Sequence, residues 1–407
     1  MTAPLAILNA RLVDPAAGTV TPGGLLVRDR HIAAIGRFDL PADAETIDAA
    51  GAHVAPGLID VGTFAIDMPA FTAGGITRAV LMPDQSPPLD HEALVQRAAA
   101  AGKPDVWIHP LAAATKGLRG HELAEIGLMK AGGACAVATG RGWIADSGVM
   151  SRLLSYARSL NLLVISHAED GGLTAGAVAT EGEYATRMGL PAAPAIAEAI
   201  AVARDIMLAE QSGARLHFRQ LSTARAFDLV RGAKRLGLPV SCGISPAHLL
   251  LSDVAIGGFR TFARLSPPLR SEEDRQAALA AIADGTIDLI CSGHDPQGPE
   301  AKRLPFVDAE AGMSGAETLL TLSLALVRDG LIDLPRLIGL LSAAPARLLG
   351  LPGGTLAVGG EADLVMFDPD TPWRIDSDQM ASRAGNTPFD GLPVQGKVLR
   401  TIKGGVA

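Results

Sequence analysis

Residues 54–88 read VAPGLIDVGTFAIDMPAFTAGGITRAVLMPDQSPP, and this stretch decides the fold. Its first part is typical of a buried β-strand, because Leu58, Ile59 and Val61 are apolar and β-prone. A second apolar run, TRAVLM at residues 77–82, predicts the next strand. The stretch therefore predicts two successive buried strands.

The same alternation continues toward the carboxyl end. Further strand-like apolar runs occupy residues 105–111, 134–139, 162–169, 214–221, 238–245 and 287–294. Ala- and Leu-rich helical segments separate them, at residues 90–102, 147–160, 194–213, 223–237 and 271–285. Eight strands that alternate with helices predict a (β/α)8 barrel. An open, doubly wound sheet is the alternative, but no Gly-rich dinucleotide loop supports it. Residues 314–330 and 334–351 predict helices after the last strand.

Both ends of the chain differ from this middle part. They consist of short β-type runs broken by Gly, Pro and Asp, without a long helical period. We therefore expect one discontinuous β-sandwich domain from residues 1–54 and 353–407, with the barrel spanning residues 55–352.

Composition limits the classes of function. The 407 residues carry a formal net charge of -8 and no Lys/Arg run, which argues against binding to nucleic acid or anionic membranes. No apolar stretch is long enough to span a membrane, and the N-terminal sequence lacks the features of a signal peptide. The three cysteines are widely spaced and form no CxxC pair, so we expect reduced thiols in a cytoplasmic protein.

Function in such a barrel is located at the carboxyl ends of the strands. Two metal-binding residues at i and i+2 of the first strand end would face the same side, but these positions hold Gly62 and Phe64, which cannot bind a metal. His167 ends one strand, and His294-Asp295 end the last. Neighbouring residues of an extended chain point to opposite sides, so the pair needs a turn to act on one atom. We interpret His217, early in its strand, as a core or bottom-face histidine, and His248 lies at a strand-to-loop boundary with no partner at metal spacing.

Beyond these residues, the sequence resembles a known family. The segments that carry the resemblance are APGLID (55–60), AGGITRAVLMPDQSPP (73–88), ISHAED (165–170), LSTARA (221–226), SPAHLLLSD (245–253), LSPPLRSEEDRQAALAAIADGTIDLICSGHDP (265–296), GMSGAETLL (312–320), LSAAPARLLGL (341–351), GTLAVGGEADLVMFDPDTPW (354–373) and GNTPFDGLPVQGKVLRTIKGG (385–405). They resemble the dihydroorotases, cyclic amidohydrolases of pyrimidine biosynthesis within the amidohydrolase superfamily. The resemblance covers nearly the whole chain and implies a metal-centred barrel with a β-sandwich built from both termini.

The departures from this family concern its chemistry. Active members carry D-x-H-x-H and a following Arg, whereas this chain keeps Asp60 but has Gly62, Phe64 and Ile66 at the other places. The remaining departures are Asp84 for a substrate-binding Asn, Thr139 or Gly140 for the metal-bridging carboxylate or carbamylated lysine, Gln220 for a ligand histidine, Gly293 for the catalytic aspartate and Gln297 for the last histidine of that motif. Only His167 remains of the metal ligands, and His294 and Asp295 are remnants. One imidazole cannot hold an ion and lower the pKa of its water.

Three functions stay open. The first is a non-catalytic, dihydroorotase-like structural or regulatory subunit, without cofactor, for which the resemblance implies aspartate carbamoyltransferase as partner in a homo- or hetero-oligomer. The second is an active zinc-dependent hydrolase of a cyclic amide C–N bond (dihydroorotase, hydantoinase or allantoinase type), with an atypical site around His167, His294 and Asp295. The third is a barrel that binds an unidentified small molecule.

Overall fold

The computed structural model describes residues 3–406, and most of them form a single α/β barrel. Eight parallel strands neighbour one another in the order β15-β14-β13-β10-β9-β8-β7-β6. Their bounds are β6 Leu58–Thr63, β7 Ile76–Leu81, β8 Trp107–Ala113, β9 Ala136–Ala138, β10 Val164–Ser166, β13 Leu216–Phe218, β14 Val240–Ile244 and β15 Leu289–Ile290. The N–H of Phe64 donates to the carbonyl of His294 (2.9 Å), so the ends of the first and last strands meet. The predicted (β/α)8 barrel with an added β domain is confirmed.

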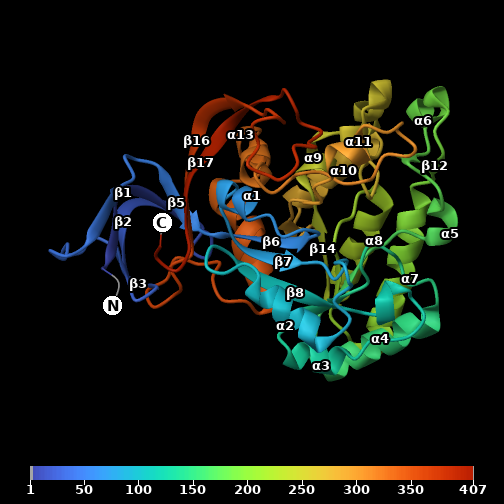
Figure 1. Ribbon diagram of the computed structural model, residues 1–407, viewed down its shortest axis with the longest axis horizontal. Helices are drawn as coiled ribbons and strands as arrows, with labels where there is room; N and C mark the ends of the chain where they lie inside the picture. The colour runs from blue at the N-terminus through green and yellow to red at the C-terminus, as the bar shows by residue number, and fades with distance from the viewer. Residues whose placement is uncertain (1–2, 407) are drawn as a thin grey trace.

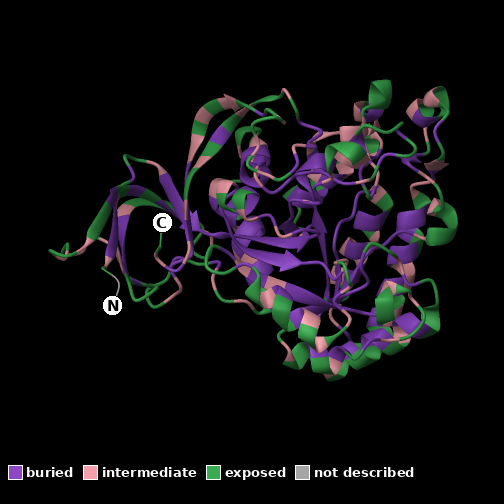
Figure 2. Cartoon of the chain, in the orientation of Figure 1, coloured by how far each residue is buried: buried purple, intermediate pink, exposed green. Residues whose placement is uncertain are grey.

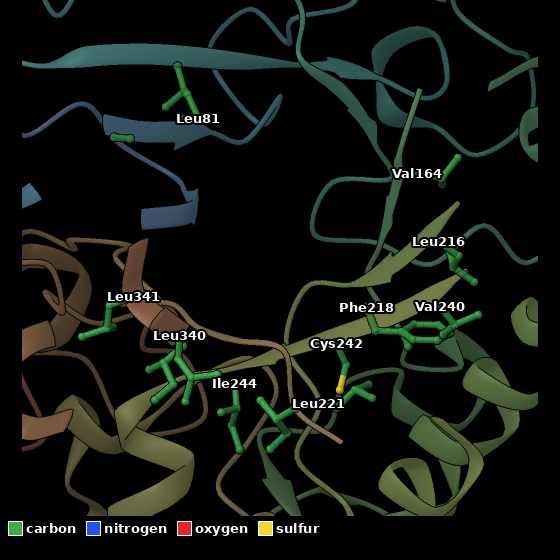
Figure 3. Packing of buried hydrophobic residues seen from close by; sticks show 14 of the residues in the cluster. Leu81, Val164, Leu216, Phe218, Leu221, Val240, Cys242, Ile244, Leu340 and Leu341 are labelled. Carbon is green, nitrogen blue, oxygen red and sulfur yellow. The ribbon is translucent and has the colours of Figure 1, made fainter. Parts of the chain in front are cut away.

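Alternation along the strands separates two apolar layers. The large cluster under the helices includes Leu58, Leu81 and Leu216. A second cluster includes Ile59, Val80, Ile165 and Leu289. This period of two follows from the pleat of a strand. Figure 3 shows Leu216, Phe218 and Val240 packed together on β13 and β14.

Helices cover the barrel, and their buried faces contrast with green solvent faces in Figure 2. The longest are α2 Glu92–Ala100, α4 Ser147–Ser159, α7 Ile196–Ser212, α8 Ala224–Arg235 and α10 Glu272–Ala283. Three of them begin at a side chain that accepts a backbone N–H group: His91 caps α2, Asp146 caps α4 and Ser271 caps α10. The predicted helices at these places are confirmed, with ends that differ by a few residues.

A seven-stranded sheet lies beside the barrel, at the left of Figure 1. Its strands come from both ends of the chain, in the order β17-β16-β5-β1-β2-β3, and β4 pairs with β1. Their bounds are β1 Leu5–Asp14, β2 Thr19–Arg28, β3 His31–Gly36, β4 Glu45–Asp48, β5 His53–Pro56, β16 Leu364–Arg374 and β17 Pro393–Ile402. The distal part of the β16–β17 pair extends along the barrel, where the Thr321 hydroxyl donates to the carbonyl of Gly396 (2.8 Å).

The structure corrects the predicted helices after the last strand. Residues 314–330 form two short helices, and residues 334–351 form two helices joined by a π-helical turn at Gly339–Ala343. These helices are α12 Leu319–Ser323, α13 Ala325–Arg328, α14 Leu334–Ile338 and α15 Ala344–Leu349. The sequence analysis missed the strand pair β11 Ala179–Thr180 and β12 Ala192–Ala193, and the short helices α5 Gly171–Thr174 and α6 Glu183–Met188 beside it. The other short helices are α1 Met68–Ala73, α3 Ile126–Ala131, α9 Pro246–Leu250 and α11 Pro299–Lys302. Among residues 3–406, no helix has the length and apolar character needed to cross a bilayer.

Candidate functional site at the barrel mouth

The carboxyl ends of the barrel strands form a mouth whose centre is occupied by an arginine. Gly62, near the end of β6, has a φ of +90°, and a Cβ added there would lie 2.9 Å from Cδ of Arg219. Arg219 follows β13 and is 3% exposed. Its side chain therefore reaches across the mouth and fills the space next to the backbone of Gly62, so a histidine does not fit there without displacing it.

Phe64 stands between two guanidinium groups. The Cζ of Arg141 lies 3.8 Å from the centre of its ring, and the Cζ of Arg219 lies 4.9 Å from it. Phe64 is 8% exposed, and its carbonyl accepts from the side-chain amide of Gln85 (3.1 Å). The negative face of an aromatic ring attracts cations, so Phe64 stabilises the two arginines at a place where a metal ligand is absent.

Gln220 belongs to a buried polar network. Its Oε1 accepts from Nη1 of Arg219 (3.0 Å), and its Nε2 lies 3.1 Å from the Ser245 hydroxyl and 3.0 Å from Nδ1 of His248. Nε2 of His248 lies 3.1 Å from the carbonyl of Pro267. Burial lowers the pKa of His248 to about 4, so this imidazole is neutral at pH 7 and joins two loops.

His167 is paired within the protein. Its Nε2 lies 3.3 Å from Oε2 of Glu169, whose other carboxylate oxygen accepts from Nη2 of Arg270 (2.7 Å). Burial on its own would raise the pKa of Glu169, but the hydrogen bond from His167 and the charge of Arg270 outweigh it and hold the pKa at about 2. The backbone N–H of His167 donates to the Thr139 hydroxyl (3.0 Å).

Asp84 and Asp295 both hold the segment around Arg141. Asp295 forms a two-pronged ion pair with the Arg141 guanidinium and accepts from the Gln297 amide (2.9 Å). One oxygen of Asp84 accepts from the backbone N–H of Arg141 (2.8 Å), and burial raises the pKa of this carboxyl group. A Cβ on Gly140 would lie 2.9 Å from the same oxygen, so a longer side chain has no room there.

His294 points away from Asp295. Its Nε2 lies 3.5 Å from Oδ2 of Asp67, a distance too long for a good hydrogen bond, and its ring packs against Phe71. Asp60 accepts from the backbone N–H (2.8 Å) and the hydroxyl of Ser292, which ties the first barrel strand to the last.

Two further positions at which this chain departs from the family are Gly293 and Ile66, and both residues suit their surroundings. Gly293 has a φ of +63°, which disfavours the aspartate expected there, and Ile66 packs against the apolar cluster under the helices. His217 is buried within β13 with its Nδ1 2.9 Å from the Ser241 hydroxyl.

A metal centre of the kind that the family resemblance implies is a poor fit to this mouth. Zinc in a hydrolytic site takes three or more protein ligands, mostly His, Cys and carboxylates. Within residues 3–406, no group of three or more such side chains is arranged to hold an ion. Instead, Arg219, which forms no ion pair with any described residue, lies in the mouth, and its positive charge repels a metal ion.

Two cavities open in the mouth. The larger, of about 280 Å³, is lined by Arg141, Trp143, His167, Glu169, Arg264 and other residues. The smaller, of about 20 Å³, is lined by Phe64, Arg219, Gln220 and Asp295 among others. Leu265 and Ser266 line both cavities. Sequence patterns do not identify Arg141, Arg219 or Arg264 as site residues, although Arg219 is visible as a charged residue directly after a buried strand.

Comparisons with known proteins agree with this architecture. Residues 47–226 match the family model described as dihydro-orotase-like. The chain is 40% identical to the dihydroorotase of Syntrophotalea carbinolica, covering 98% of this chain and 97% of that protein. It is 38% identical to the "dihydroorotase-like protein" of Pseudomonas aeruginosa, covering 98% of each.

Among solved structures, the L-hydantoinase of Arthrobacter aurescens superposes with a TM-score of 0.87 at 25% identity, covering 99% of this chain and 95% of that one. Whole-length identity of this size, together with the shared barrel and added sheet, shows the family. The chain belongs to the dihydroorotase-like family of the cyclic amidohydrolases.

Proposed function

We propose that this chain is a non-catalytic member of its family that serves as a structural or regulatory subunit. The observation that supports the proposal best is the position of Arg219, whose side chain fills the space next to Gly62 where a ligand histidine is expected. Metal-assisted hydrolysis needs several ligands to hold an ion and lower the pKa of its bound water. A guanidinium group cannot bind a metal and raises the cost of placing one nearby.

The partner we propose is aspartate carbamoyltransferase, as the family resemblance implies. In this role the chain needs its fold and its outer surface, whereas the chemistry of the mouth is dispensable. The test mixes the purified chain with aspartate carbamoyltransferase from the same organism and measures molar mass by light scattering after gel filtration. One peak that contains both chains at a fixed ratio is the expected result, and two separate peaks at micromolar concentrations count against the partner.

The relatives' names favour a second candidate, an active cyclic amidohydrolase. The Syntrophotalea carbinolica protein is named a dihydroorotase, and the Arthrobacter aurescens structure is an L-hydantoinase. For this chain, the candidate requires an atypical site that uses His167, His294 or Asp295. These three residues do not act together in the structure, because His294 and Asp295 point apart. In addition, His167 is already paired with Glu169, and Asp295 is already paired with Arg141.

Two measurements separate the candidates. The first is the content of zinc and other transition metals in protein purified without chelators: we expect far less than one ion per chain. The second is turnover of dihydroorotate, hydantoin and allantoin, with His167→Ala as the variant and His121→Ala, at an exposed histidine, as its matched control. About one metal per chain, or turnover that His167→Ala abolishes and His121→Ala does not, would establish the second candidate.

A further inference from the structure

The mouth contains two arginines, Arg219 and Arg264, that form no ion pair with any acidic side chain among residues 3–406. Arg219 is 3% exposed, makes its one side-chain hydrogen bond to the neutral amide of Gln220, and forms no ion pair within residues 3–406. Its Nε is buried without a partner. Burying an unpaired guanidinium is costly, so the site is incomplete as far as charge is concerned.

Arg264 repeats this pattern at the rim. It is half-buried, its Nε is also buried without a partner, and its side chain makes neither an ion pair nor a hydrogen bond to any described residue. The acidic groups whose charges act on it, Glu310 and Asp308, are both exposed to solvent. Arg264 lines the larger cavity and Arg219 lines the smaller one, and the two cavities are neighbours because Leu265 and Ser266 line both.

The other charges that line the larger cavity are already balanced. Arg141 is paired with Asp295, and Glu169 is paired with both Arg270 and His167. Arg264 therefore leaves the lining with an excess of positive charge, and Arg219 adds to the positive field from the neighbouring cavity. Such a field attracts anions into the cavity.

Size decides which cavity an anion occupies. About 20 Å³ accommodates roughly one water molecule, whereas 280 Å³ accommodates a small oxyanion with water around it. A guanidinium group binds carboxylate and phosphate oxygens with two parallel hydrogen bonds, and Ser266 adds an exposed hydroxyl to the same lining.

We propose that the larger cavity at the barrel mouth binds a small oxyanion, a carboxylate or a phosphate, through Arg264, with Arg219 adding positive charge from the neighbouring cavity. This site differs from the place that the family resemblance assigns to the substrate carboxylate, where this chain has Ile66 and Asp84. It goes beyond the proposed function and is independent of any partner.

The experiment titrates the purified full-length chain with inorganic phosphate and, in a second arm, with succinate, at constant ionic strength set by sodium chloride. Binding is followed by calorimetry and by the shift of the thermal midpoint. We expect saturable binding of at least one anion; phosphate alone identifies a phosphate site, and succinate alone identifies a carboxylate site.

Variants locate the binding. Arg264→Gln should weaken the affinity about tenfold, because it removes a charged hydrogen-bond donor, and Arg264→Lys should restore part of it. Arg303→Gln is the matched control, since Arg303 is exposed and lines neither cavity. Binding that is absent for both anions, or that Arg264→Gln and Arg303→Gln leave equally unchanged, overturns the proposal.

Discussion

Two arginines of the barrel strands are almost equally buried but differ in their partners. Arg78, on β7, is 2% exposed, and Arg219, after β13, is 3% exposed. Arg78 is paired with Glu361 and Asp363, which directly precede β16 of the added sheet, and its Nη1 lies 3.2 Å from Nε2 of His109. Arg219 has one amide oxygen and the face of Phe64. The first arginine joins two parts of the molecule, whereas the second lines a cavity and forms no ion pair within residues 3–406, so burial alone does not identify a structural residue.

The largest effect on stability is expected from a substitution of Arg78. Arg78→Met leaves the buried carboxylate of Asp363 without its cation, and we expect the free energy of unfolding to fall by about 3–5 kcal/mol. Urea unfolding followed by circular dichroism measures this, with Arg28→Met, at an exposed arginine of β2, as the control. A loss equal to that of the control would mean that the ion pair adds nothing to stability.

Acid should affect the paired charges of the mouth. The pKa of Glu169 in the folded protein is about 2, below its ordinary value of 4.5, so its contribution is fully present above pH 4.5 and is lost as the pH falls toward 2. We expect about 2–3 kcal/mol of stability to disappear over this range through this group. Urea midpoints between pH 6 and pH 2 should fall less steeply for Glu169→Gln than for the unmodified chain or for Glu183→Gln, an exposed control. Parallel curves for all three proteins would contradict the assignment.

Gly62 tests whether Arg219 fills the mouth. Gly62→Ala places a Cβ 2.9 Å from Arg219 Cδ at a φ of +90°, and we expect it to cost about 1–3 kcal/mol of stability. In an Arg219→Ala background the steric part vanishes and the backbone strain remains, so the cost should be smaller. Chemical unfolding of the four proteins of this double-mutant cycle measures the difference. Additive effects would place the Arg219 side chain elsewhere in solution.

The smallest effect is expected at Arg219 itself. Arg219→Met removes a buried charge that forms no ion pair with any described residue and keeps an apolar contact with Phe64, so the free energy of unfolding should change by less than about 1 kcal/mol or rise. The same urea experiment as for Arg78→Met applies, and the two variants are directly comparable. Equal, large losses would show that Arg219 is compensated as fully as Arg78 is.

Much of the architecture follows from local patterns. Apolar residues recur with a period of two in half-buried strands and of 3.6 in amphipathic helices. The eight barrel strands and five covering helices could therefore be predicted from the sequence. The missed elements, β11 and β12 with the helices beside them, are only two to six residues long, too short for any period to show. Residues 314–330 were read as one helix because their apolar pattern is continuous, whereas the chain there breaks between α12 and α13.

The barrel mouth, unlike the strands and helices, could be predicted from the sequence only in part. The loss of histidines at Gly62 and Phe64 is visible in the sequence, because the kind of side chain alone excludes a metal bond. That Arg219 fills the space beside Gly62 is not visible, since the two residues are far apart in the chain and meet only because β13 and β6 close one barrel. The pairing of Arg78 with acidic residues and the isolation of Arg219 likewise depend on which strands become neighbours. Periodicity encodes the elements, whereas the environment of a buried charge depends on contacts made across the folded chain.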